Sequence, residues 1–261
     1  MRCILFSLVT FALIICSSIA SAATPRYIPI FVYHNFEPIK KGSMTISTKK
    51  FEEQLQWLKT NGYTVIPLKE AVAYLQGKIA SVPAKSVVIT IDDGRITVFT
   101  HALPIVKRYN IPVTLFIYPS IISREPYAMT WGQLKELQQT RLFNIQSHTF
   151  SHPNFKQEKR HLSAEKYTQF VNFELNHSKK ILAEKAGTPV TLLAWPFGIY
   201  NDDVERAAAK SGYEMAFSIA YRCATKSDRA MAVPRYMLLE TQSMKLFTMM
   251  AACRMQPTKY K

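Results

Sequence analysis

Cysteine is scarce in this chain, and its scarcity excludes one class of fold. Only four cysteines occur in 261 residues, and two of them, Cys3 and Cys16, lie in the N-terminal segment discussed next. The other two, Cys223 and Cys253, could form one disulfide in an exported protein, but the sequence leaves their pairing open. A scaffold built on several disulfides is therefore excluded.

Long apolar segments are also lacking. Arg2 precedes an apolar stretch at residues 4–15, and small residues follow through Ala22, which is the pattern of a secretory signal peptide over residues 1–22. The stretch is shorter than the ~20 residues that a membrane-spanning helix needs, although an uncleaved anchor is the alternative. No later segment is long and apolar enough to span a bilayer. Residues 23–261 are thus predicted to form a single exported domain, periplasmic, extracellular or attached to the cell envelope.

Acidic residues are few relative to basic ones. The chain has 33 Lys and Arg against 18 Asp and Glu, a formal net charge of +15, and the basic residues are scattered along its length. Scattered charge favours attraction to anionic envelope surfaces over binding in a nucleic-acid groove. No recognition helix, zinc finger or base-stacking motif is present, so nucleic acid is not an expected partner. Internal repeats, linkers and an added carbohydrate-binding module are absent too, and we expect a monomer.

What the sequence does contain is a regular alternation of strand-like and helix-like segments. Repeated alternation with apolar strands predicts parallel strands covered by helices, and about seven such units fit a distorted (β/α) barrel better than an open sheet. The predicted strands are 28–33, 63–66, 86–91, 113–118, 143–147, 191–195 and 215–219, and the predicted helices are 49–60, 68–75, 97–109, 131–139, 163–186, 202–211 and 244–253.

Residues suited to chemistry follow four of these strands directly. In a (β/α) barrel the active site lies at the carboxyl ends of the strands, so residues at these positions converge on one opening. Each motif alone has an ordinary explanation as a turn or a surface histidine, but their joint placement favours a site. They are His34, Asp92 with Asp93, His148 with His152, and the turn Trp195-Pro196-Phe197-Gly198.

The residue types among them favour metal-assisted hydrolysis. One carboxylate and two imidazoles suffice to hold a divalent metal with an open coordination position. A second, adjacent carboxylate is then free to act as a base. The sequence therefore predicts a metal-dependent hydrolase.

The same motifs resemble those of the NodB-homology polysaccharide deacetylases. Thr90-Ile91-Asp92-Asp93-Gly94 is similar to the Thr-Phe-Asp-Asp-Gly motif of that family, and Ser147–Pro153 is similar to its His-(Ser/Thr)-x-x-His metal motif. Ala194–Gly198 resembles its Ala-Tyr-Pro-Phe/Tyr-Gly variant. The opening Tyr33-His34 and the segment 51–65 are similar to the poly-N-acetylglucosamine deacetylase branch. The resemblance extends from Ile28 to about Ile219.

The resemblance implies a metal site and a base. Asp93, His148 and His152 would hold the metal, with Zn²⁺ favoured and Co²⁺ or Ni²⁺ as alternatives. Asp92 would accept a proton from the attacking water. The turn formed by Trp195, Pro196, Phe197 and Gly198 would bind substrate, with the Phe197 backbone N–H stabilising the oxyanion.

Three departures from the main branch of the family bear on the remaining roles. No histidine follows His177 to supply the late acid of that branch, so His34 becomes the candidate acid, as in the poly-N-acetylglucosamine branch. Ala194 stands where the main branch has an arginine that steadies the base, and Arg235 is the candidate replacement. Trp195 either stacks on a sugar ring or packs in the barrel rim.

The leading hypothesis is an exported, metal-dependent deacetylase that removes N-acetyl groups from an amino-sugar polymer resembling poly-N-acetylglucosamine. Alternatives with the same chemistry are peptidoglycan, chitin oligomers, O-acetyl esters or a small-molecule amide. An alternative of another class is a non-catalytic glycan-binding protein, which would have lost metal ligands. The segments 35–47, 120–130 and 154–162 are the expected groove loops.

Overall fold

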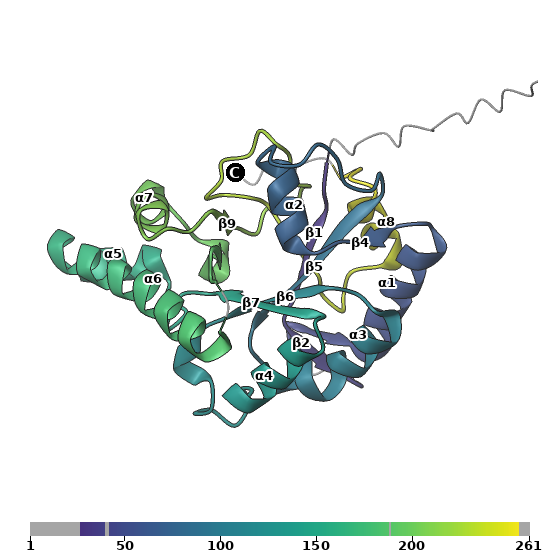
Figure 1. The fold of residues 1–261 in the computed structure, drawn as a ribbon, viewed down its shortest axis with the longest axis horizontal. Coiled ribbons are helices and arrows are strands. Elements are labelled where there is room, and N and C mark those ends of the chain that lie inside the picture. Colours follow the sequence, from purple (N-terminus) through teal and green to yellow (C-terminus); the bar gives the residue numbers. More distant parts are fainter. Residues whose placement is uncertain (1–26, 40–41, 188, 256–261) are drawn as a thin grey trace, which may run out of the picture.

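The fold is a curled, parallel sheet surrounded by helices (Figure 1). The computed structural model describes residues 27–39, 42–187 and 189–255, so the predicted signal peptide lies outside the described residues. The strand order is β10-β1-β5-β6-β7-β8-β9, with β4 paired to β5. The strands of this sheet are β1 (Ile30–Tyr33), β4 (Thr64–Val65), β5 (Ser86–Asp93), β6 (Val113–Ile117), β7 (Phe143–Ser147), β8 (Leu192–Ala194), β9 (Met215–Phe217) and β10 (Tyr236–Met237).

The α-helices follow the strands in the alternation expected from the sequence, which confirms the predicted barrel type. They are α1 (Thr48–Thr60), α2 (Leu68–Leu75), α3 (Leu103–Tyr109), α4 (Trp131–Gln139), α5 (Phe155–His161), α6 (Ala164–Ala186), α7 (Asp202–Lys210) and α8 (Met244–Ala251). Short helical turns η1 (Val98–Ala102), η2 (Pro119–Ile121) and η3 (Pro196–Gly198) complete the set. The caps of α6 agree with the sequence, because Ser163 accepts a hydrogen bond at its start and Gly187 ends it with a φ of 65°.

Side-chain alternation on the strands separates the interior of the curled sheet from its helix-covered exterior. On β5, Val87 and Ile89 belong to the large core shared with the helices, whereas Val88 belongs to a second cluster. That second cluster includes Phe116 of β6 and Phe217 of β9, and α2 contributes to it as well. The interior is therefore a packed core, which supports the residues at its open end.

The two edges of the sheet approach each other through the segment that leads into β10. Val233 accepts a hydrogen bond from Ser218 at 2.8 Å and donates one to Ala216 at 2.9 Å. Ala220 donates to the carbonyl of Arg235 at 3.1 Å, while β10 itself pairs with β1. This arrangement brings Arg235 inside the curled sheet, next to strands that are far from it in sequence.

Two expected loops contain regular structure. Segment 35–47 includes a parallel pair of short strands, β2 (Asn35–Glu37) and β3 (Thr45–Ser47). Segment 154–162 contains α5, whose residues are mostly polar and show no apolar periodicity. The helix is instead started by Asn154, whose side chain accepts from two backbone N–H groups, and is anchored by fully buried Phe155. Tertiary packing thus determined the helical structure of a segment whose hydrophobic pattern predicted no helix.

A disulfide joins Cys223 to Cys253, with 5.8 Å between the two Cα atoms, and so links the segment after β9 to the end of α8. The sequence had left this pairing open. No helix in the described part of the chain has both the length and the hydropathy needed to cross a bilayer.

Candidate metal centre and catalytic residues

Asp92 lies at the carboxyl end of β5 and is almost completely buried, with an exposed fraction of 1%. Arg235, fully buried, donates from its two terminal nitrogens to the two carboxylate oxygens at 2.8 and 2.7 Å. Burial raises the pKa of Asp92, but the charges of Arg235 and His148 outweigh it and hold that pKa below its ordinary value. Asp92 is therefore a buried carboxylate whose ionised form is stabilised by a paired guanidinium.

Arg235 is itself held by neighbours on β5 and β6 and by the residue that follows β9. Its third nitrogen donates to the carbonyl of Ser218 at 3.3 Å, and one terminal nitrogen also donates to the Thr90 hydroxyl at 3.1 Å. The guanidinium carbon lies 5.2 Å from the centre of the Phe116 ring. These contacts fix the planar fork that matches a carboxylate.

Asp93, His148 and His152 form the group whose side chains suit a metal. One ligand atom from each lies within 4.8 Å of the others. The Oδ1 atom of Asp93 is 3.8 Å from Nε2 of His148 and 3.7 Å from Nε2 of His152. Two ligands about 2.1 Å from one tetrahedral ion lie roughly 3.4 Å apart, so these side chains fit a small divalent cation after a minor contraction.

The protonation of the two histidines also fits metal binding. Nδ1 of His148 lies 2.8 Å from the carbonyl oxygen of Ala194, which can only accept, so Nδ1 donates there and Nε2 is the nitrogen directed at Asp93. Burial, with help from His148, lowers the pKa of His152 to about 4. Both imidazoles therefore direct Nε2 towards Asp93.

The five-residue segment that carries both histidines is fixed by a residue that sequence analysis missed. Glu174 of α6 is buried, with an exposed fraction of 2%. Its carboxylate accepts from the backbone N–H groups of Phe150 and Ser151 at 2.9 and 2.8 Å and from the Ser151 hydroxyl at 2.6 Å. These charge-assisted bonds hold the segment between the two histidines.

Two residues of this segment need that support, and Glu174 carried a signal in the sequence. Thr149 and His152 adopt left-handed φ angles of 64° and 60°, which cost free energy in a non-glycine residue. Glu174 occupies the buried face of α6, in the same stripe as Val171 and Leu175. An acidic residue inside an apolar helical stripe needs a polar partner, and this could have marked Glu174 from the sequence.

His34 follows β1 and faces the same centre. It is buried, and its Nδ1 has no hydrogen-bond partner among the described residues. Burial lowers its pKa, while the negative charges of Asp92 and Asp93 oppose that shift. The next residue, Asn35, accepts a hydrogen bond from the Thr97 hydroxyl at 2.6 Å, which ties the end of β1 to the segment after β5.

The turn after β8 differs in part from the expectation. Trp195 is fully buried and donates its indole N–H to the carbonyl of Met231 at 2.8 Å, and Pro196 is buried as well. Neither side chain presents a face to substrate, so the predicted substrate contact of these two side chains is corrected to packing. Phe197 is 58% exposed, and its ring centre lies 4.6 Å from that of His152.

The backbone of this turn is tightly constrained. Phe197 and Gly198 have φ angles of 58° and 70°. A Cβ atom on Gly198 would lie 2.8 Å from the backbone nitrogen of Ile219, closer than real contacts allow. Glycine is therefore required at position 198 by both conformation and space. The constrained turn fixes the position of Phe197 next to His152.

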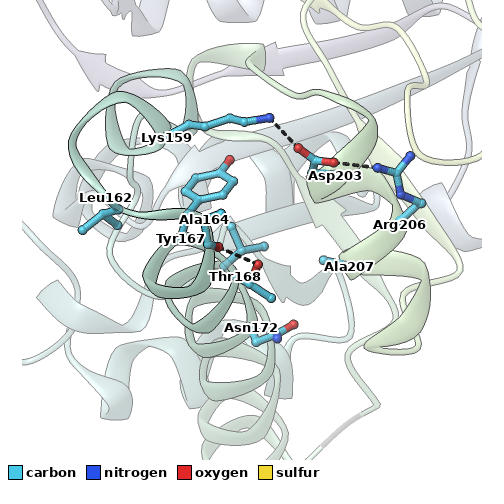
Figure 2. A pocket seen from close by; sticks show the side chains of 10 residues that line it. Lys159, Leu162, Ala164, Tyr167, Thr168, Asn172, Asp203, Arg206 and Ala207 are labelled. Atoms are coloured by element: carbon cyan, nitrogen blue, oxygen red, sulfur yellow. Dashed lines mark hydrogen bonds and ion pairs between the residues drawn. The ribbon is translucent and has the colours of Figure 1, made fainter.

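A separate cavity of about 520 Å³ lies between α5, α6 and α7 (Figure 2). Asp203 on its edge accepts hydrogen bonds from Lys159 at 2.5 Å and from Arg206 at 2.6 Å. None of the candidate metal ligands lines this cavity. Because its charged groups already pair with one another, we assign it no part in the chemistry.

Comparisons with known proteins agree with the fold and the motifs. The polysaccharide deacetylase family model matches residues 80–216. Poly-β-1,6-N-acetyl-D-glucosamine N-deacetylase of Staphylococcus aureus (strain MRSA252) is 28% identical over 213 residues, which cover 80% of this chain and 72% of that protein. YxkH of Bacillus subtilis (strain 168), whose name assigns it to the polysaccharide deacetylases, is 31% identical and covers 81% of this chain and 71% of its own length.

Solved structures show the same fold. The deacetylase PplD of Streptococcus pyogenes, in complex with acetate, superposes with a TM-score of 0.77 at 26% identity, covering 87% of this chain and 99% of that one. IcaB of Ammonifex degensii gives a TM-score of 0.74 at 24% identity, covering 88% and 97%. With a family model across more than half of the chain, the chain belongs to the polysaccharide deacetylases, a family of hydrolases.

Proposed function

We propose that this protein removes N-acetyl groups from a polymer of N-acetylglucosamine, of the β-1,6-linked type on which the staphylococcal relative acts. The observation that carries the proposal is the grouping of Asp93, His148 and His152 next to the buried pair Asp92–Arg235. The non-catalytic alternative loses support, because the candidate metal ligands that such a protein would have lost are all present in this grouping.

Asp93, His148 and His152 would hold a divalent metal, with zinc favoured by the mixed nitrogen and oxygen ligands. When bound, the ion would supply Lewis-acid activation of the water and of the acetyl carbonyl. The chain contributes the orientation of these ligands through Ala194 and Glu174, which fix His148 and the segment after it.

Asp92 would accept the proton of the attacking water. Its Oδ2 atom lies 3.7 Å from Nε2 of His148, so the base sits beside the metal ligands. Arg235 stabilises the ionised form of the Asp92 carboxylate and binds both of its oxygens from one side. The protein, and not solvent, therefore sets the orientation of the remaining lone pairs of Asp92. A base of this kind contributes roughly 10²- to 10⁴-fold to the rate.

His34 would deliver a proton to the departing sugar amine, and the backbone N–H of Phe197 would stabilise the oxyanion formed from the acetyl carbonyl. Burial lowers the pKa of His34, which favours release of a proton from its imidazolium, and its Nδ1 has no hydrogen-bond partner among the described residues. We further propose that the protein acts after export, because such a polymer lies outside the cell.

Acetate release tests the proposal. The mature protein is incubated with β-1,6-linked N-acetylglucosamine oligomers before and after chelation, and again after zinc is restored. We expect release that depends on metal and falls by about 10²- to 10⁴-fold in Asp92→Asn. Asp202→Asn, an exposed carboxylate with 75% of its side chain accessible, is the matched control and should retain activity.

The outcomes separate the remaining substrates. Asp92→Asn should still bind zinc in equilibrium dialysis, since Asp92 is not among the ligands. Zinc binding without acetate release from these oligomers would overturn the polymer assignment and leave chitin oligomers, peptidoglycan or acetyl esters. Absence of zinc binding in the wild-type protein would overturn the metal-dependent mechanism altogether.

A further inference from the structure

The outward side of α6 is uncharged over three turns, in a chain that is otherwise strongly basic. Between Lys166 and Lys179 the only acidic residue is Glu174, which is buried, and no lysine or arginine occurs. The exposed residues of this stretch are Thr168, Gln169, Asn172, Phe173 and Asn176, and His177 is half-buried. The stretch is joined to the segment that carries the two histidines, because Glu174 accepts hydrogen bonds from the backbone of Phe150 and Ser151.

An organised aromatic cluster lies at the centre of this surface. Phe173 is 49% exposed, and its ring stacks on His177 with 4.7 Å between centres. The edge of the cluster is formed by Phe150, whose ring lies 5.3 Å from Phe173 and 4.6 Å from His177. Rings that are held in place by one another suit binding, because their orientation is already fixed before a ligand arrives.

The cluster is mechanically tied to the metal centre. Phe150 is two residues from both His148 and His152, so its Cα lies within about 7 Å of theirs. Glu174, the neighbour of Phe173, fixes the backbone of Phe150 through the hydrogen bond at 2.9 Å. The surface and the metal ligands are therefore held by the same backbone segment.

We propose that Gln169, Phe173, Asn176 and His177 bind the sugar units of the polymer that adjoin the unit being deacetylated. This inference rests on the proposed function. The apolar C–H face of a pyranose ring would pack on Phe173. The carboxamide nitrogens of Gln169 and Asn176 already donate within α6, so their oxygens would accept hydrogen bonds from sugar hydroxyl and acetamide N–H groups. An uncharged surface suits N-acetylated units, which carry no charge themselves.

Chain length of the substrate provides the test. Binding of β-1,6-linked N-acetylglucosamine dimer and hexamer is measured with Asp92→Asn, which isolates binding from turnover, with and without Phe173→Leu. We expect Phe173→Leu to weaken hexamer binding by roughly three- to tenfold, the size of one aromatic contact, and to change dimer binding by less than about twofold. Phe173→Trp should restore hexamer binding.

Kinetics of the otherwise unaltered protein supply a second measurement. Phe173→Leu should raise KM for the hexamer and leave kcat unchanged, because the contact is made equally in the ground and transition states. Tyr27→Leu is the control, since Tyr27 is exposed to a similar extent (44%) but precedes β1, at the end of the barrel away from the metal ligands. It should leave both constants unchanged.

Three results would overturn the inference. Equal losses for dimer and hexamer would mean that Phe173 acts through Phe150 on the metal ligands. Unchanged hexamer binding in Phe173→Leu, or equal affinity of dimer and hexamer for the parent protein, would mean that no sugar binds there. Failure of the proposed function looks different, because then the wild-type protein would release no acetate from any β-1,6-linked oligomer, whatever residue 173 is.

Discussion

The ends of β5 and β7 both supply residues to the site, but they are held by different forces. At the end of β5, Asp92 is fixed by charge, through the two bonds of 2.8 and 2.7 Å from Arg235. At the end of β7, His148 and His152 are fixed by backbone geometry, because Glu174 binds two N–H groups of the segment between them.

The contacts at the end of β5 therefore control the ionisation of Asp92, whereas those at the end of β7 control the positions of the two histidines. Arg235 sets the charge of Asp92, so its loss should appear first in pH dependence and in global stability. Glu174 sets the direction of two metal ligands, so its loss should appear first in metal affinity. Substitutions at the two ends can therefore be told apart by what they change.

Removal of Arg235 should have the largest effect. Arg235→Met leaves the carboxylate of Asp92 buried without its partner, and the free energy of unfolding should fall by about 3–5 kcal/mol. Urea denaturation at neutral pH measures the change. Arg108→Met is the control, because Arg108 pairs with Glu52 on the surface, where such a pair contributes about 0–1 kcal/mol. A loss below about 1 kcal/mol in Arg235→Met would contradict the role given to charge at β5.

The same variant should also change the pH dependence of stability. In the wild-type protein the lowered pKa of Asp92 contributes stability that is present above its unfolded pKa and disappears as the pH falls through the folded value. In Arg235→Met, burial alone should raise that pKa above the ordinary value. The stability deficit should then be greatest at neutral pH and shrink on acidification, and the acid limb of kcat/KM should move to higher pH. A deficit independent of pH would show that Arg235 acts through packing.

Glu174→Gln should have the next largest effect, at the end of β7. The substitution keeps the shape but removes the charge that binds Phe150 and Ser151, and the dissociation constant of zinc should rise about 10- to 100-fold. Isothermal titration with zinc, and the visible spectrum of the cobalt-substituted protein, measure the change without relying on activity. Glu184→Gln, exposed on the same helix, is the control. Unaltered zinc affinity together with lower thermal stability would reduce Glu174 to a structural residue.

Ser151→Ala should have the smallest effect and shows how the support from Glu174 is divided. It removes only the hydroxyl bond of 2.6 Å and leaves the two backbone bonds in place. We expect a loss of about 0.5–1.5 kcal/mol in stability and a change in zinc affinity of a few-fold at most. A change as large as that of Glu174→Gln would show that the hydroxyl, and not the backbone bonds, positions the histidines.

Much of the fold was predictable because local pattern and tertiary packing agree. The strand 143–147 and the helices 68–75 and 131–139 were predicted with the observed bounds, since their apolar spacing is regular. The helix predicted at 97–109 begins instead as the π-helical turn η1, a change that hydrophobic spacing does not reveal. Helix α5 escaped prediction because its single buried residue, Phe155, gives no period.

The site was predicted unevenly for the same reason. Short contiguous motifs contain Asp92, Asp93, His148 and His152, so these residues could be identified as candidates from the sequence alone. Trp195 stood in such a motif too, yet its two possible roles differ only in which way the ring points, and the structure places the ring in the core.

By itself, the sequence determined the strand–helix alternation, the family motifs and the chemical types of the candidate ligands, because these depend on neighbours along the chain. Only the tertiary structure decided that Arg235 pairs with Asp92 across 143 positions, that Cys223 pairs with Cys253, and that Glu174 holds the metal-ligand segment. Those contacts depend on where the sheet curls and on which helix face is buried. Contacts between residues so far apart along the chain produce no hydrophobic periodicity that a single sequence could reveal.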